Sequence, residues 1–125
     1  MNRDEFIKGY FEFKKSALAV AAKARREGIL GLGSVIDGEK ADERGIFHYG
    51  LRFAVDGVAY EIIEKILSNI IEQEKDDYSH RFKIIQKEAV MAVHAGLNPQ
   101  ILRYILNSYT DLSIRDEDAQ EETGG

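Results

Sequence analysis

The 125-residue sequence predicts an all-α protein, a small helical bundle with one long helix at about residues 59–95 and short helices before and after it. Apolar side chains recur at three- and four-residue steps in several segments, which is the spacing of one helix face. Few β-branched residues alternate at period two, so strands are not expected. Residues 59–95 contain neither Pro nor Gly, the residues that most often end a helix.

The first helix is expected over residues 3–27. Asn2 or Asp4 can cap its start, because short polar side chains accept hydrogen bonds from the first free backbone N–H groups. Gly28 is expected to end it in a left-handed conformation, which costs Gly little. One face of this helix is apolar and consists of Phe6, Tyr10, Phe13, Ala17, Val20 and Ala24.

The segment that follows is the least regular part of the chain, with five glycines between residues 28 and 45. Residues 34–38 predict a short turn or a single helical turn that Gly38 ends. Residues 46–55 predict a short helix, which Asp56 and Gly57 stop.

The long helix at residues 59–95 has two apolar stripes separated by a polar waist, residues 72–77. At about 1.5 Å per residue, a continuous helix would be about 55 Å long, more than a chain of this size can bury. Either the waist bends, or the helix projects and packs against another chain. We favour projection, and therefore expect a homo-oligomer.

Gly96 is expected to end the long helix, and Asn98 with Pro99 to start a last helix over residues 100–109. Residues 111–125 hold six acids and one base, which accounts for the whole net charge of −5. We therefore expect a helical domain over residues 1–110 and an acidic disordered tail over residues 111–125. A neutral body argues against general binding to nucleic acids or anionic membranes.

The composition also limits which locations and functions are expected. Cys is absent, no secretory leader is apparent, and no apolar run approaches the roughly 20 residues that span a bilayer. We therefore expect a cytoplasmic protein without membrane insertion. His48, His80 and His94 lack metal-ligand spacing, and the carboxylates of the waist face solvent. No catalytic residue, metal site or cofactor is predicted, so the chain is not expected to be an enzyme.

Four stretches resemble parts of the flagellar stator protein family MotA. Residues 24–32, ARREGILGL, resemble its "A-R-x-E-G-x-L-x-L" segment, and residues 50–57, GLRFAVDG, its "G-L-x-x-x-V-D-G". Residues 62–74 are similar to the amphipathic helix that follows. Residues 89–99 resemble "G-x-x-A-x-x-x-G-x-N-P", found after the last membrane helix of that family. The membrane helices have no counterpart here, because residues 82–90 carry several charges.

The resemblance implies a contact with the rotor protein FliG, in which the family uses an Arg and a Glu eight residues later. The Arg corresponds to Arg25, whereas Gly33 occupies the Glu position and leaves Glu27 or Glu39 as substitutes. The residues themselves also indicate a basic rim at the end of the first helix, suited to an acidic protein surface; the alternative is a solvated helix end. The predicted partner-binding residues are Lys23, Arg25, Arg26 and Glu27.

The leading hypothesis is a non-catalytic, cytoplasmic helical interaction module at the flagellar motor, with a motor component such as a rotor protein as its partner. The alternative is a homo-oligomeric helical adaptor unrelated to motility, in which the long helix is the self-association surface.

Overall fold

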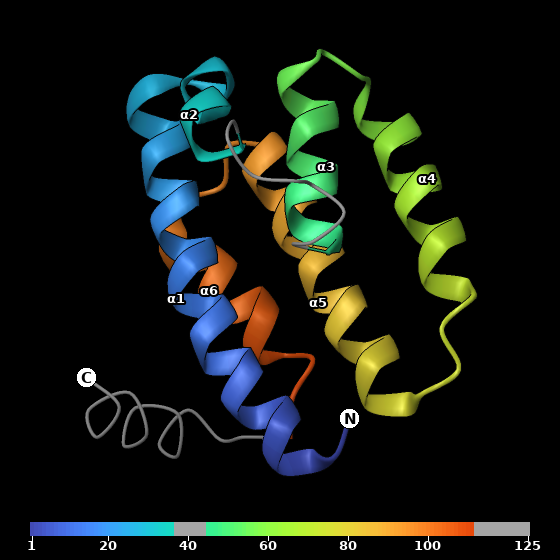
Figure 1. Cartoon of the computed structure of the whole chain (residues 1–125). Coiled ribbons are helices and arrows are strands. Elements are labelled where there is room, and N and C mark those ends of the chain that lie inside the picture. Colours follow the sequence, from blue (N-terminus) through green and yellow to red (C-terminus); the bar gives the residue numbers. More distant parts are fainter. Residues whose placement is uncertain (37–44, 112–125) are drawn as a thin grey trace.

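The computed structural model describes residues 1–36 and 45–111 of the chain. Their regular structure is entirely helical (Figure 1), which confirms the predicted all-α class. None of the helices in the described ranges is long and apolar enough to cross a membrane. In chain order the elements are α1 (Arg3–Glu27), the 3₁₀ helix η1 (Ile29–Leu32), α2 (Gly33–Ile36), α3 (Ile46–Val55), α4 (Tyr60–Glu72), α5 (Asp77–His94) and α6 (Pro99–Asn107).

Helix α5 is the centre of the bundle, since α1, α3, α4 and α6 all pack against it. α1 also packs against α6, and α4 against α3, so α4 forms one edge of the molecule (Figure 1). A single core results, to which six elements each contribute a fully buried side chain: Tyr10, Leu32, Leu51, Leu67, Ile85 and Leu102.

The favoured prediction, one long projecting helix, was wrong, and the alternative of a bend at the polar waist is confirmed. α4 ends at Glu72, α5 begins at Asp77, and the chain reverses between them. The two helices pack against each other, so the chain folds back at the polar waist and no helix projects. The reversal lets both apolar stripes enter the core, because Leu67 of α4 and Ile85 of α5 are then fully buried together.

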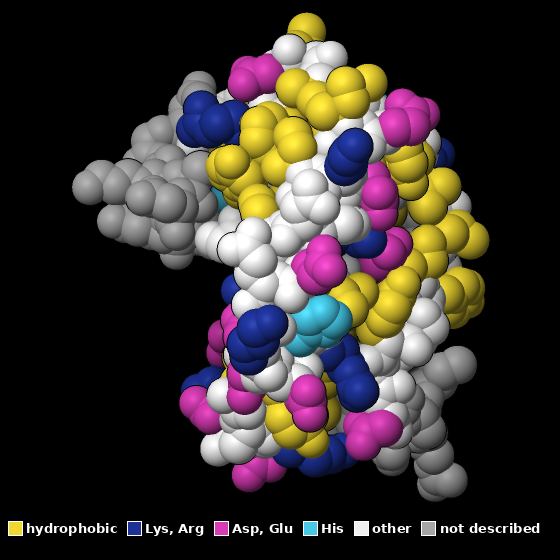
Figure 2. Space-filling model, turned by 90° about the vertical axis from the view of Figure 1, so that its right-hand side faces the viewer, with side chains coloured by type: hydrophobic (Ala, Val, Ile, Leu, Met, Phe, Trp, Pro, Cys, Tyr) yellow, Lys and Arg dark blue, Asp and Glu magenta, His cyan; other side chains and the backbone are white. Residues whose placement is uncertain are grey.

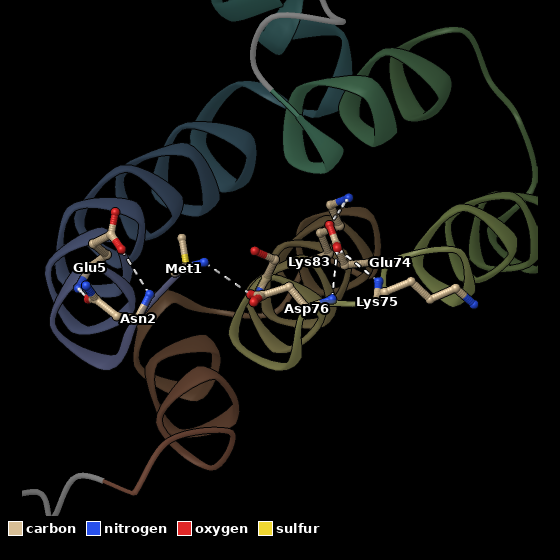
Figure 3. A network of polar contacts seen from close by, with 8 residues as sticks. Met1, Asn2, Glu5, Glu74, Lys75, Asp76 and Lys83 are labelled. Carbon is tan, nitrogen blue, oxygen red and sulfur yellow. Dashed lines mark hydrogen bonds and ion pairs between the residues drawn. The ribbon is translucent and has the colours of Figure 1, made fainter.

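Acidic side chains of the waist hold this reversal (Figure 3). The Glu74 carboxylate accepts hydrogen bonds from the backbone N–H groups of Lys75 and Asp76, at 3.0 and 3.1 Å, and lies 2.8 Å from the Lys83 ammonium. Asp76 then caps α5 by accepting from the Ser79 N–H at 2.8 Å. The N-terminal ammonium of Met1 lies 3.4 Å from the same Asp76 carboxylate.

The predicted ends of the other helices are largely confirmed. α1 spans residues 3–27, and Asn2 is its cap, in a reciprocal pair with Glu5. Asn98 caps α6 by accepting from the Ile101 N–H at 2.9 Å, and the helix begins one residue earlier than predicted and ends at Asn107. Gly28 has a positive φ of 81°, as expected, but its ψ of 169° is extended rather than left-handed helical.

Two predictions lie mainly outside the described residues: the Gly38 end of the turn at residues 34–38 and the acidic tail. The turn itself begins as predicted, since α2 is a single helical turn. Of the tail, Asp111 is described, and its carboxylate accepts a hydrogen bond from Arg3 at 3.1 Å.

Two polar side chains are buried where a simple apolar face was expected. Gln86 of α5 accepts a hydrogen bond from the Phe47 N–H at 3.1 Å, which satisfies a free donor in the first turn of α3. Lys14 of α1 places its ammonium 4.8 Å from the Phe11 ring centroid and 5.3 Å from that of Tyr10. Aromatic faces attract a cation, so this burial is partly compensated.

Gly50 allows α3 to approach its neighbours closely. A Cβ at this position would lie 2.8 Å from both methyl groups of Val90 and 3.0 Å from a methyl group of Leu67. The three helices α3, α4 and α5 therefore meet at a point where no side chain fits.

We expect Gly50→Ala to lower the free energy of unfolding by up to about 2 kcal/mol. Overpacking a core costs about 1–3 kcal/mol, and the better helix propensity of Ala returns about 1 kcal/mol. Urea unfolding followed by circular dichroism measures the difference. The control is Gly9→Ala, also inside a helix, where the nearest atom is the rim of the Phe82 ring at 3.3 Å. A Gly50 variant no less stable than the Gly9 variant would contradict the close approach.

Candidate functional site

The predicted partner-binding residues lie together at the C-terminal end of α1, where the chain turns into η1. We call this surface the basic corner: Lys23, Arg25, Arg26, Glu27 and the turn Ile29–Leu32 that follows them. Arg25, Arg26 and Glu27 are exposed, and Lys23 is half-buried. Three cations and one acid within five residues leave the corner positively charged. The site therefore has the charge that the sequence predicts.

Lys23 and Glu27 are engaged with each other. The Lys23 ammonium lies 2.8 Å from the Glu27 carboxylate, one helical turn away. The hydrogen bond from Lys23 lowers the pKa of Glu27, and the positive charges of Lys23 and Arg26 act in the same direction. Glu27 is therefore a paired acid, and this pair contributes no net charge to the corner.

Arg25 has a structural partner. Its guanidinium donates a hydrogen bond to the carbonyl oxygen of Gly96 at 2.7 Å, across 71 residues of sequence. Gly96 follows the end of α5, where free carbonyl groups attract cations. Arg25 thus joins the end of α1 to the end of α5, and only part of its hydrogen-bonding capacity remains for another molecule.

Arg26 is the cation that the fold leaves available. Its side chain is exposed on α1, and it forms no hydrogen bond or ion pair with any residue in the ranges 1–36 and 45–111. Of the three predicted cations, it is the one whose charge is turned to solvent without a described partner.

Leu30 is the residue of this surface that the sequence analysis missed. It is 79% exposed, the highest value among the large hydrophobic side chains of the described residues. The neighbouring Leu32 is fully buried, so the 3₁₀ turn is anchored on one side and presents Leu30 on the other. Gly31 packs against α1, since a Cβ there would lie 2.6 Å from the Cβ of Glu27. Leu30 therefore projects from a turn that the buried Leu32 and the close contact of Gly31 with α1 hold in place, shortly after Arg26 in the chain.

Charged groups that could perform chemistry also meet between α4 and α5. The Ser68 hydroxyl donates to the Glu64 carboxylate at 2.9 Å, and the Lys87 ammonium lies 3.2 Å from Glu64 and 3.4 Å from Ser68. The hydrogen bonds from Ser68 and Lys87 lower the pKa of Glu64, which makes it a weak base toward the hydroxyl. The cluster therefore links α4 to α5 and is poorly suited to activating a nucleophile.

The described residues hold no group of three or more His, Cys, Asp or Glu side chains that could bind a metal ion. Two of the three histidines pack against aromatic rings: His94 has its ring centroid 5.6 Å from that of Tyr60, and His48 has its ring centroid 5.7 Å from that of Phe47.

Comparison with known proteins gives no relative from which a function could be taken. Neither a family model, nor a curated protein, nor a solved structure matches this chain. The function is therefore argued from the surfaces of the molecule and from the resemblance of its sequence motifs.

We expect the protein to lose stability as the pH falls below about 4.5, the ordinary pKa of a Glu side chain. The pKa of Glu74 is lowered in the folded protein, first by the hydrogen bond from Lys83 and then by the N–H of Asp76. As the pH falls, the unfolded chain therefore binds more protons than the folded protein. The contribution of Glu74 to the free energy of unfolding is complete above this pH and is lost below it. Glu64 and Asp76 act in the same sense.

Urea unfolding between about pH 7 and pH 3 measures this decline. Glu74→Gln is expected to flatten the pH dependence, whereas Glu12→Gln, at an exposed position of α1 without a described partner, is expected to leave it unchanged. Equal slopes for the two variants would show that the acids at the chain reversal do not carry the effect.

Proposed function

We propose that this chain is a non-catalytic helical interaction module that binds an acidic surface of another protein through the basic corner. The observation that carries the proposal is the projecting Leu30, on the fixed turn that follows the exposed Arg26 at the end of α1. A projecting apolar side chain on a positively charged surface suits a binding role, because its burial would supply affinity and the charge would supply orientation.

The resemblance to the MotA cytoplasmic region supports the flagellar motor as the setting, with a motor component such as a rotor protein as the partner and the cytoplasm as the compartment. The resembling segments, far apart in the sequence, pack together in this fold. Arg25 in residues 24–32 donates to Gly96 in residues 89–99, and Gly50 in residues 50–57 packs against Val90. Three segments that resemble one family thus form one continuous part of the bundle.

The departures from the family pattern restrict the kind of contact. Gly33 stands where the family has a Glu, and Glu27 is already paired with Lys23. Glu39 lies outside the described residues. The described part of the corner therefore offers a cation and an apolar side chain but no free acid, which suits a partner surface with carboxylates around an apolar pocket.

A second candidate function, a homo-oligomeric adaptor, is favoured by a separate observation: α4 carries exposed apolar side chains on the face turned away from the core. The projecting helix first proposed as the self-association surface does not exist, so α4 takes its place in this alternative.

We expect Arg26→Glu to weaken binding to a purified FliG-type rotor protein by about tenfold or more, because an attractive contact becomes a repulsive one. Isothermal titration calorimetry at low salt measures this change. Arg26 is a sharper target than Arg25, since replacing Arg25 also removes the bond to Gly96. Leu30→Ser is expected to weaken binding as well.

The matched control is Lys15→Glu, the same charge change at an exposed position of the same helix. It should bind like the unchanged protein. Equal losses for the Arg26 and Lys15 variants would indicate a general charge effect, and no binding by the unchanged protein would exclude the rotor protein as its partner.

A further inference from the structure

Helix α4 is apolar on two faces. Ile63, Leu67 and Ile71 are buried in the core, as expected of a helix on the surface of a bundle. A second row, Ile62, Ile66 and Ile70, follows beside it, with Ile62 54% exposed and the other two half-buried; Ile70 also packs against the edge of the core. α4 forms an edge of the bundle (Figure 1), so this row is accessible to another molecule.

Figure 2 looks onto this edge and shows apolar side chains gathered over its upper part, with acidic and basic side chains beside them. On α4 these charges include Lys65 and Glu72, which are both exposed. Neither forms an ion pair with another residue in the described ranges. One free cation and one free anion therefore border the outer face of the helix.

The order of these residues around the helix is regular. With about 100° of rotation per residue, Ile66 and Ile70 fall on one side of the exposed Asn69. Lys65 and Glu72 fall on the other side. Along the helix axis, the midpoint between Ile66 and Ile70 nearly coincides with the midpoint between Lys65 and Glu72, close to residues 68 and 69. The outer face thus has an apolar row and a charged row that share a midpoint.

We propose that a second copy of this chain packs antiparallel along α4, with the two-fold axis next to Asn69. An antiparallel copy reverses positions along the axis while keeping each row on its own side. Ile66 then meets Ile70 of the second copy, Lys65 meets Glu72 of the second copy, and each contact forms twice.

The charges favour a second copy over a different partner. A partner surface of one sign would repel either Lys65 or Glu72, whereas a copy of the same helix offers the opposite charge at both places. Asn69, at the centre, can pair with its own equivalent and fix the register, as a polar residue does within an apolar helix pair. This inference deepens the adaptor candidate, and it does not depend on the basic corner.

Charge exchange tests the arrangement. The unchanged protein should show twice its monomer mass of 14.1 kDa by light scattering at low salt and high concentration. Lys65→Glu and Glu72→Lys should each raise the dissociation constant by at least about tenfold, because two like-charge contacts replace two pairs. Mixed in equal amounts, the two variants should form a heterodimer, since both contacts are then restored.

Each outcome decides the proposal. A monomer at all concentrations, single variants that dimerise like the unchanged protein, or a mixture that stays monomeric would overturn it. Circular dichroism should show both variants folded, because the residues are exposed. The Lys65 variant should keep the corner's affinity for a rotor protein, so failure here is distinguishable from failure of the proposed function.

Cross-linking gives a second measurement that needs no charge change. The chain has no Cys, so Asn69→Cys introduces a single thiol next to the proposed axis. Mild oxidation should join two copies at least about tenfold faster than in Lys15→Cys, an exposed control on α1, because proximity raises the effective concentration of the thiols. Equal rates would contradict the antiparallel packing.

Discussion

The chain reversal between α4 and α5 is the constraint on which the rest of the bundle depends. It occurs over four residues without Gly or Pro. The Glu74 carboxylate satisfies two backbone N–H groups of the turn, and the Asp76 carboxylate satisfies a free N–H group in the first turn of α5. The reversal places α5 in the centre, where four other helices bury their apolar faces against it. Without it, Leu67 and Ile85 could not share a core.

Apolar periodicity and the positions of Gly, Asn and Pro predicted the class and most helix ends, because those signals act within a few residues. A bend at the waist was one of two alternatives, and projection was favoured over it because residues 59–95 contain neither Pro nor Gly. The local signal was present in Asp76, a good cap residue placed three before Ser79, whose N–H it accepts. The capping of α3 by Gln86 could not be predicted in this way, since donor and acceptor are 39 residues apart.

Only part of the candidate site could be predicted from the sequence as well. Its cations were predictable, because helix ends favour them and the run of basic residues is visible in the sequence. Their different roles were not. Arg25 is bonded to a carbonyl 71 residues away, Lys23 is paired within the helix, and Arg26 has no partner among the described residues. The exposure of Leu30 depends on which side of a 3₁₀ turn is buried, and short apolar runs do not specify this.

The two proposed surfaces lie on opposite sides of the bundle, the basic corner at the end of α1 and the outer row on α4, with α3 between them (Figure 1). Packing along α4 therefore leaves the corner uncovered. A dimer of this kind would present two corners to a partner, and if that partner is itself an array of repeated subunits, the second contact forms at a high effective concentration. If the corner binds as proposed, one available cation and one projecting Leu would supply only modest affinity, and the proposed pairing through α4 would increase it.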